Sequence, residues 1–186
     1  MRTRNIDRLG AWRRRLRKSF RVEVSGTTGR SFAPYVRKHL QAARRFLKTA
    51  PKWLGVVLIG DRQMAELHYR FINIDGPTDV LTFPLDEDEH GVIHGEVYVC
   101  VPEARRRAGE IPGRSVRDEV LLYALHGMLH LCGMDDRTDR GYRRMHRLED
   151  SILRRIGVGP LFHLNPPPTK PITHRKSNQQ KGRRAR

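Results

Sequence analysis

The sequence has few of the residues that stabilise secreted or membrane proteins. Only two of its 186 residues are cysteines, Cys100 and Cys132, which is too few for a disulfide framework and indicates a reducing compartment. No run approaches the ~20 apolar residues of a membrane-spanning helix. The arginines near the N-terminus are not followed by the apolar segment of a secretory signal. The sequence therefore predicts a cytoplasmic protein without a membrane span.

Acidic residues are scarce at both ends of the chain. Residues 1–21 contain nine Arg or Lys and one Asp, and residues 165–186 contain seven Arg or Lys and no acid. Because the whole chain carries +17, only +2 remains for residues 22–164. We therefore expect a nearly neutral folded domain at 22–164, a basic N-terminal extension at 1–21 and a basic disordered tail at 165–186.

Basic segments of this kind attract polyanions, and nucleic acid is the polyanion that clustered Arg and Lys residues most often bind. The sequence thus favours contact with RNA or DNA. The alternative is that the two segments are solvated and only keep the protein soluble.

Strand and helix patterns follow one another without a regular alternation. Short β-branched or alternating runs bounded by Gly or Pro predict strands at 21–26, 53–60, 76–84 and 95–101. Apolar residues at helical spacing predict helices at 32–50, 61–72, 102–110, 115–132 and 138–157. This mixture predicts an α+β fold, a small mixed sheet with helices packed on it.

Three local features refine this prediction. The strand at 76–84 has a proline at each end, which is typical of a strand at the edge of a sheet. The segment 85–94 is rich in acids and is predicted to be a loop. Asp61 is predicted to be the N-cap of the helix at 61–72.

The stretch HGMLHLCGMDD (126–136) places two histidines four residues apart in the mostly apolar helix at 115–132. Residues i and i+4 share a helix face, so His126 and His130 point the same way. A buried imidazole needs a partner, and one metal ion would engage a nitrogen of each ring. H-x-x-x-H is the spacing of helical zinc pairs. The alternative is a pair of core histidines with ordinary hydrogen bonds.

A third ligand would have to come from beyond this helix. Gly133 stands where a helix C-terminal glycine would, so the chain can turn back and bring Asp135 or Asp136 to the histidine face. Cys132 suits zinc chemically, but it lies about 200° round the helix from His130. Two histidines and one carboxylate would leave a fourth position for water, as in catalytic zinc sites.

Two neighbouring residues limit the other interpretations of this stretch. Asp139 has a competing role as N-cap or first-turn acid of the helix at 138–157. Gly127 occupies the place at which the H-E-x-x-H motif carries its general base, so a zinc peptidase is disfavoured.

HGMLHLCGMDD resembles the H-G-x-L-H-L-x-G-Y-D-H signature of the YbeY-type metal-dependent endoribonucleases. PTDVLTFP (77–84) is similar to the P-T-D-V-L-S-F-P segment of that family, and GEVYVC (95–100) is similar to its G-D-I-x-I-S strand. MHRLEDSILRRIG (145–157) resembles its closing helix. The resemblance covers about residues 22–157.

The resemblance implies a mixed, about four-stranded sheet packed with about five helices, and a zinc-type metal site at the end of the central helix. It also implies single-strand-specific RNA hydrolysis in ribosomal RNA maturation, especially at the small-subunit 3′ end, and in ribosome quality control. The implied partners are therefore ribosomal RNA and the small ribosomal subunit. By the motif match, His126, His130 and Asp136 hold the metal. Arg70 stands where the family carries an arginine at the active-site cleft, so we expect it to grip the phosphate.

The sequence departs from the family pattern at the third ligand, where Asp136 replaces histidine. An anionic ligand cancels one charge of the ion, so another divalent metal such as Mn²⁺ becomes more competitive with Zn²⁺. Met134 and Thr82 replace the family's Tyr and Ser. The alternative function is a ribosome-associated RNA-binding factor with a structural metal and little nuclease activity, and a hydrolase acting on another substrate is a third possibility.

Other polar residues near these motifs receive smaller roles. We expect Asp79 to fix the turn before its strand, and Asp135 to be structural or to orient a ligand histidine. His94 and His146 could approach the site, although no pattern places them there. Cys100 and Cys132 are expected to be small core residues.

Overall fold

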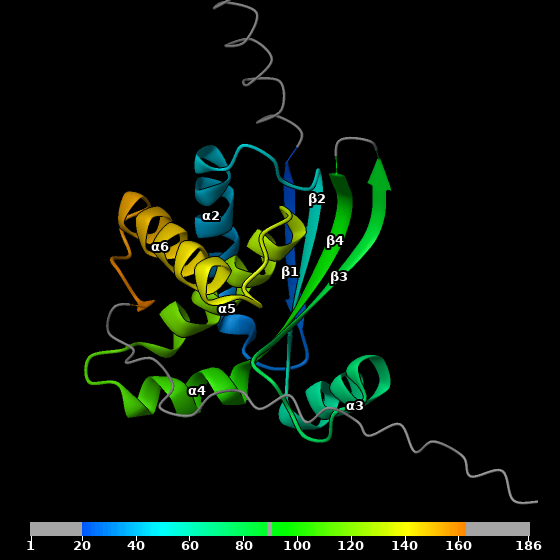
Figure 1. Ribbon diagram of the computed structural model, residues 1–186. Coiled ribbons are helices and arrows are strands. Elements are labelled where there is room, and N and C mark those ends of the chain that lie inside the picture. Colours follow the sequence, from blue (N-terminus) through cyan, green and yellow to red (C-terminus); the bar gives the residue numbers. More distant parts are fainter. Residues whose placement is uncertain (1–19, 89–90, 163–186) are drawn as a thin grey trace, which may run out of the picture.

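The computed structural model describes residues 20–88 and 91–162. Four strands form one mixed sheet in the order β1-β2-β4-β3 (Figure 1). Strands β1 (Arg21–Gly26), β2 (Trp53–Ile59) and β4 (Gly91–Cys100) run parallel, and β3 (Val80–Asp88) pairs with β4 in the antiparallel sense. Strand β3 is an edge strand, as the two prolines of the predicted strand at 76–84 indicated. The predicted α+β fold with a four-stranded mixed sheet is confirmed.

The prediction of an acidic loop at 85–94 is wrong. Strand β3 continues to Asp88 and β4 begins at Gly91, so most of this segment forms a hairpin. The register shifts on either side of Asp86, a local irregularity that lets a proline-containing edge strand continue its pairing. Pairing with β4 satisfies the backbone, while the acidic side chains of Asp86 and Glu87 stay exposed. Cross-strand pairing thus overrides a composition that is unfavourable for strands.

Helices begin and end close to the predicted positions, with two differences. The predicted helix at 32–50 is shorter, because Leu47 adopts an extended conformation after the 3-10 turn Arg44–Phe46. Asp61 is the first helical residue rather than the N-cap, because the Gly60 carbonyl accepts the first helical hydrogen bond from Met64. The helices are α2 (Ala33–Ala43), α3 (Asp61–Ile72), α4 (Val101–Glu110), α5 (Val116–Leu131) and α6 (Asp139–Arg155), with a further 3-10 turn at Arg30–Phe32.

The sheet separates two apolar clusters because alternate residues of a strand face opposite sides. Val97 and Val99 of β4 face the main core, which helices α2, α5 and α6 complete. Cys100 faces a smaller cluster with Met64 of α3 and Leu81 of β3. Figure 1 shows α2, α5 and α6 together on one side of the sheet. Helix α5 is therefore central, and almost its entire length is buried.

Gly127 sets how closely α5 approaches the sheet. A Cβ atom at this position would lie 2.5 Å from Cγ1 of Val97 and 2.9 Å from Oγ1 of Thr82. A side chain here would push the helix away from β3 and β4. The residue that takes the place of a peptidase general base is therefore a packing glycine, and it fixes where the neighbouring His126 stands.

The basic segments 1–21 and 165–186 lie outside the described residues, except for Phe20 and for Arg21, which opens β1. Within the described residues, no helix is long and apolar enough to cross a membrane.

Candidate metal centre

Residues next to α5 in the sequence cap both ends of this helix. At its start, the Ser115 hydroxyl accepts a hydrogen bond from the Asp118 backbone N–H at 3.2 Å. At its end, Gly133 adopts a φ of 81°, its N–H donates to the His130 carbonyl, and the Met134 N–H donates to the Leu129 carbonyl. These two bonds form the Schellman motif that a glycine after a helix favours. The chain therefore turns back towards the histidine face, as the sequence predicted.

The turn brings Asp136 to the two histidines. The Nε2 atoms of His126 and His130 lie 3.0 Å apart. Asp136 Oδ2 lies 3.4 Å from His126 Nε2, and Oδ1 lies 3.7 Å from His130 Nε2. Tetrahedral zinc with bonds of about 2.0–2.1 Å needs ligand atoms roughly 3.3 Å apart, so this donor set fits such an ion. The structure thus brings together all three residues that the sequence assigned to a metal, and together they could hold one.

Second partners orient both imidazoles. His130 Nδ1 lies 3.0 Å from the Met134 carbonyl oxygen, which can only accept, so Nδ1 carries the proton and Nε2 stays available for a metal. His126 Nδ1 lies 2.7 Å from Glu149 Oε1. A carboxylate or carbonyl behind a ligand histidine is a common support of protein metal sites.

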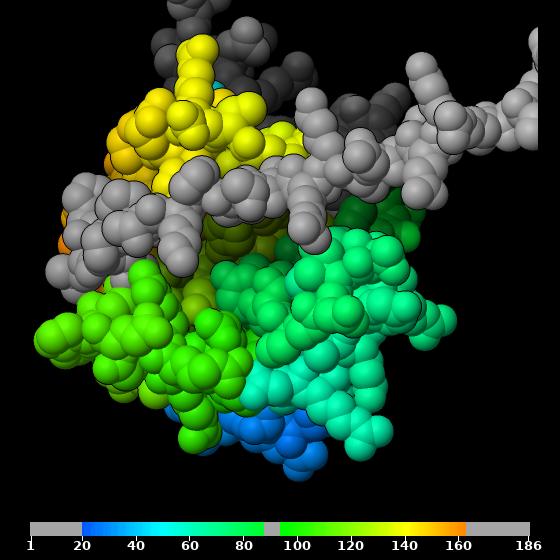
Figure 2. Space-filling view, turned by 60° about the horizontal axis from the view of Figure 1, so that its bottom comes forward, coloured from blue at the N-terminus to red at the C-terminus, as the bar shows by residue number. Residues whose placement is uncertain are grey.

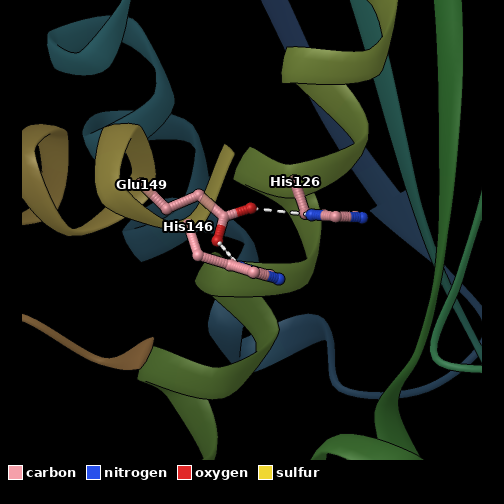
Figure 3. A group of neighbouring side chains, drawn as sticks. All are labelled: His126, His146 and Glu149. Carbon is pink, nitrogen blue, oxygen red and sulfur yellow. Dashed lines mark hydrogen bonds and ion pairs between the residues drawn. The ribbon is translucent and has the colours of Figure 1, made fainter. Parts of the chain in front are cut away.

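Glu149 joins His126 to a third histidine (Figure 3). Its second oxygen, Oε2, lies 2.5 Å from His146 Nδ1, and its side chain has no exposed surface. In Figure 3 the outer nitrogens of the two rings point in the same direction, away from Glu149. The role of Glu149 was not predicted from the sequence, and no sequence pattern placed His146 here. The available signal was that Glu149 lies on the apolar stripe of α6, four residues after the buried Met145.

The two carboxylates change the protonation of the site. Burial opposes a charged imidazole at His126, but hydrogen bonds to Asp136 and Glu149 outweigh it and raise the pKa of His126 to about 10. The His126 hydrogen bond in turn holds the pKa of Asp136 below its usual value. A metal that binds at Nε2 must displace this proton, so metal binding will release it.

The structure places the remaining acids and cysteines elsewhere. Asp135 is exposed, and its carboxylate accepts hydrogen bonds from the backbone and guanidinium of Arg137 at 2.7–3.0 Å, so its role is structural. Thr138 caps α6, leaving Asp139 as a first-turn acid. Cys100 is buried and Cys132 packs against the main core, as expected.

His94 and Asp79 each have polar partners in the structure. His94 contacts Asp86, with 3.5 Å between His94 Nδ1 and Asp86 Oδ2, and lies beside Trp53. Asp79 fixes its turn, as expected, because Oδ1 accepts hydrogen bonds from the Val80 N–H and the Thr78 hydroxyl.

Arg70 lies in the last turn of α3 and is exposed. Its guanidinium carbon lies 5.7 Å from the centre of the Phe71 ring. Among the described contacts, none joins Arg70 to His126, His130 or Asp136. The structure thus leaves the assignment of Arg70 as a prediction.

A pocket of about 180 Å³ adjoins the histidine cluster. Its lining includes His126 of α5, three residues of α6, Arg107 of α4 and Asp79, which precedes β3. The three residues of α6 are Tyr142, His146 and Glu149. Figure 2 shows this part of the surface hollowed between α3, α4 and α6. The metal centre therefore adjoins, through His126, a recess that could hold part of a substrate.

Substitutions of the two neighbouring aspartates distinguish their roles. We expect Asp136→Ala to weaken metal binding by more than the roughly 10–100-fold that loss of an orienting partner costs, because a ligand itself is lost. Asp136→His restores the family's usual ligand type and should retain the metal. Asp135→Ala is the matched control and should bind metal like the wild type. Isothermal titration with Zn²⁺ measures all three, and normal binding by Asp136→Ala would exclude this carboxylate as a ligand.

Comparisons with known proteins agree with this architecture. The family model described as endoribonuclease YbeY matches residues 20–157. The endoribonuclease YbeY of Thermobifida fusca (strain YX) is 39% identical over 109 residues, covering 54% of this chain and 69% of the relative. That of Frankia casuarinae is 34% identical over 148 residues, covering 71% of this chain and 72% of the relative.

A solved structure is similar over most of the chain. The solution structure of TM1509 from Thermotoga maritima aligns with a TM-score of 0.51 and 25% identity, over 81% of this chain and 99% of that one. Within the described residues, the family match includes the whole of the four strands and of the five α-helices. The predicted family and enzyme class are confirmed, and the chain belongs to the YbeY family of endoribonucleases.

Proposed function

We propose that this protein is a metal-dependent endoribonuclease that cuts single-stranded RNA during ribosomal RNA maturation in the cytoplasm. We propose the 3′ end of the small-subunit RNA as its target and ribosome quality control as a second role. The observation that carries the proposal is the convergence of His126, His130 and Asp136 beside a pocket that His126 also lines. The family match supports RNA as the substrate.

His126, His130 and Asp136 would hold the ion through two nitrogen donors and one carboxylate. Two histidines and one carboxylate are a ligand set of catalytic zinc, and the anionic ligand keeps other divalent ions competitive. Such an ion, when bound, polarises a phosphoryl oxygen and makes a bound water more acidic.

The chain's own residues prepare this site in three ways. Glu149 and the Met134 carbonyl hold the rings of His126 and His130, so that each Nε2 faces the same point. Asp136 supplies the negative charge that helps to retain a cation. Arg70 would grip the phosphate with paired guanidinium donors.

A purely structural metal is the alternative. Structural zinc sites have four protein ligands, whereas catalytic sites have three and one open position. Among the described residues, the group around His130 consists of three ligand-bearing side chains. This count supports the enzyme over a binding factor with a structural metal.

The proposal is tested by elemental analysis combined with a cleavage assay. Purified protein should contain about one divalent ion per chain. It should cut a single-stranded ribosomal RNA fragment, leave the same sequence in a duplex intact, lose activity with a chelator and regain it with Zn²⁺ or Mn²⁺. Full metal content without cleavage would favour the binding factor, and cleavage that resists chelation would exclude a metal mechanism.

We expect Arg70→Ala to reduce RNA cleavage by about 10²-fold or more, the usual cost of losing one donor to transition-state charge. Arg70→Lys should also fail, because an ammonium cannot replace the paired donors. Metal content and melting temperature should not change, since Arg70 is exposed. Arg62→Ala is the matched control, because Arg62 is an exposed arginine on the same helix that pairs with Glu66. Equal cleavage by the Arg70 and Arg62 variants would remove Arg70 from the mechanism.

We further propose that the basic segments 1–21 and 165–186 increase RNA affinity while the domain at 22–164 cuts. Each contact with a phosphate of single-stranded RNA adds about −0.7 to the slope of log affinity against log salt. The full chain should therefore show a steeper slope than residues 22–164 alone, as measured by RNA binding across a salt series. Equal slopes would show that the segments do not contact RNA.

A further inference from the structure

The pocket beside the metal centre is a continuation of the same face of α5. Glu119, Tyr123, His126 and His130 follow one another at spacings of four, three and four, which places them along one side of a helix. The first three line the pocket, and the last two belong to the metal centre. His126 is common to both. A substrate with its phosphate at the metal centre would therefore have its adjoining group at the pocket.

One wall of the pocket is a stack of aromatic rings. His146 lies parallel to Phe162, with ring centres 3.6 Å apart and 2° between the planes, and the Tyr142 ring meets His146 edge-on at 4.2 Å. The bond to Glu149 fixes the orientation of His146. A rigid aromatic wall of this kind suits a flat ring, because single-stranded RNA is held largely by stacking of its bases on aromatic side chains.

A carboxylate with a vacant oxygen faces the same pocket. Both hydrogen bonds of the Asp79 side chain go to Oδ1, and within the described residues no donor contacts Oδ2. The backbone of Asp79 is also fixed, because its carbonyl accepts a hydrogen bond of 2.8 Å from the Cys100 N–H. Asp79 thus offers one positioned acceptor to a ligand.

The other charges at the pocket leave this acceptor unbalanced. The carboxylate of Glu119, on the buried floor, lies 3.0 Å from the Arg114 guanidinium. Glu149 lies between two histidines. Arg107 pairs with Glu110 at 2.7 Å. Among these acids, Asp79 is therefore the one to which a ligand could donate a hydrogen bond from an N–H or NH₂ group.

We propose that this pocket binds the base of the nucleotide next to the phosphate that is cut, and that it prefers bases with an exocyclic amino group over uracil. This inference rests on the proposed function for the position of the phosphate. The volume of about 180 Å³ is below the roughly 300–1,000 Å³ of pockets for drug-sized ligands, so a single base fits it better than a larger group. The base stacks on the Tyr142–His146–Phe162 wall and donates its amino group to Asp79 Oδ2.

The preference follows from the edges of the bases. Cytosine, adenine and guanine each carry an amino donor that a carboxylate can accept. Uracil offers only one N–H, which lies between two carbonyl oxygens. The carboxylate of Asp79 would repel these oxygens, because both groups are acceptors. Sites that hydrogen-bond a ligand group discriminate strongly against analogues that lack it.

The four nucleoside 5′-monophosphates test this inference on the metal-loaded full chain. They share one phosphate and one sugar, so differences in affinity report the base. They contain no internucleotide bond, so the result does not depend on RNA cleavage. In NMR titrations we expect CMP, AMP and GMP to bind at least about five-fold more tightly than UMP. UMP binding as tight as that of the other three would overturn the proposal, whether or not the protein cuts RNA.

Asp79→Asn changes the donor pattern with little change in shape. Its Oδ1 can keep both turn hydrogen bonds, while Nδ2 replaces Oδ2 and presents a donor. The preference against UMP should therefore fall to about two-fold or reverse. Asp86→Asn is the matched control, an exposed aspartate on β3 outside the pocket, and should keep the wild-type preference. An unchanged preference in a folded Asp79→Asn variant would exclude Asp79 as the reader of the base.

Tyr142 tests the stacking wall independently. Tyr142→Leu should weaken all four nucleotides by about five-fold or more, because base–aromatic stacking is lost. Tyr142→Phe retains a ring and should bind like the wild type. Normal affinity in Tyr142→Leu would show that the base does not lie against this wall.

Discussion

Replacing His130 with alanine will remove stoichiometric metal and abolish RNA cleavage. His130 Nε2 lies 3.0 Å from His126 Nε2 and 3.7 Å from Asp136 Oδ1, so its loss leaves only two of the three converging ligands. His126 and Asp136 alone would then bind an ion only weakly. The fold should survive, since His130 lies at the partly exposed end of α5. Elemental analysis, the cleavage assay and circular dichroism measure the three effects.

His39→Ala is the matched control for this substitution. His39 is also a half-buried histidine on a helix, and its Nδ1 bonds to a backbone carbonyl, that of Tyr35, at 2.8 Å. It lies on α2, outside both the metal centre and the cluster of His126, Glu149 and His146. The control should retain its metal and its cleavage rate. A His130→Ala protein with one ion per chain would show that the metal centre lies elsewhere.

Glu119→Gln will have the largest effect on stability. The Glu119 carboxylate lies 3.0 Å from the Arg114 guanidinium, and both side chains are 1% exposed. Burial raises the pKa of Glu119 while Arg114 opposes that rise, so the pair depends on mutual compensation. Gln removes the negative charge that compensates the buried guanidinium of Arg114. The expected loss is about 3–5 kcal/mol, or roughly 6–20 °C in melting temperature.

The control for Glu119 is an exposed pair of similar length. Glu103 and Arg106 lie 2.7 Å apart on α4, with side chains 35% and 47% exposed. Because water screens such a pair, Glu103→Gln should cost no more than about 1 kcal/mol. Thermal melts of both variants provide the comparison. Equal melting temperatures would show that the buried pair contributes no more than the exposed one.

The positions of the regular elements were predictable because they depend on neighbours along the chain. Strand β1 at 21–26 and helix α3 at 61–72 have the predicted bounds, since side-chain periodicity determines which face of each element is buried. The direction of His126 and His130 follows from their spacing on one helix. The turn at Gly133 follows from the conformation that glycine adopts after a helix.

Residues distant in sequence could be placed only by the tertiary structure. Glu149 reaches His126 across 23 positions because α6 packs against α5, and no local pattern shows which residue of α6 will face a given histidine. The hairpin through Asp86 required pairing with β4, which its composition did not favour. The spacing of Asp135 and Asp136 left both as possible ligands, and only the family motif favoured Asp136. In the structure Asp136 lies 3.4 Å from His126 Nε2, whereas the Arg137 side chain engages Asp135.

The sequence by itself thus determined the family, the sheet and the helix that presents the two histidines, since these depend on motif order and local periodicity. Only the tertiary structure decided that Glu149 supports His126, that His146 and Tyr142 form the wall of a pocket, and that Asp79 faces the same space. Those contacts depend on how the faces of α5 and α6 and the start of β3 pack together. Packing of this kind is set by side-chain shapes over the whole core, and the order of residues along one element does not reveal it.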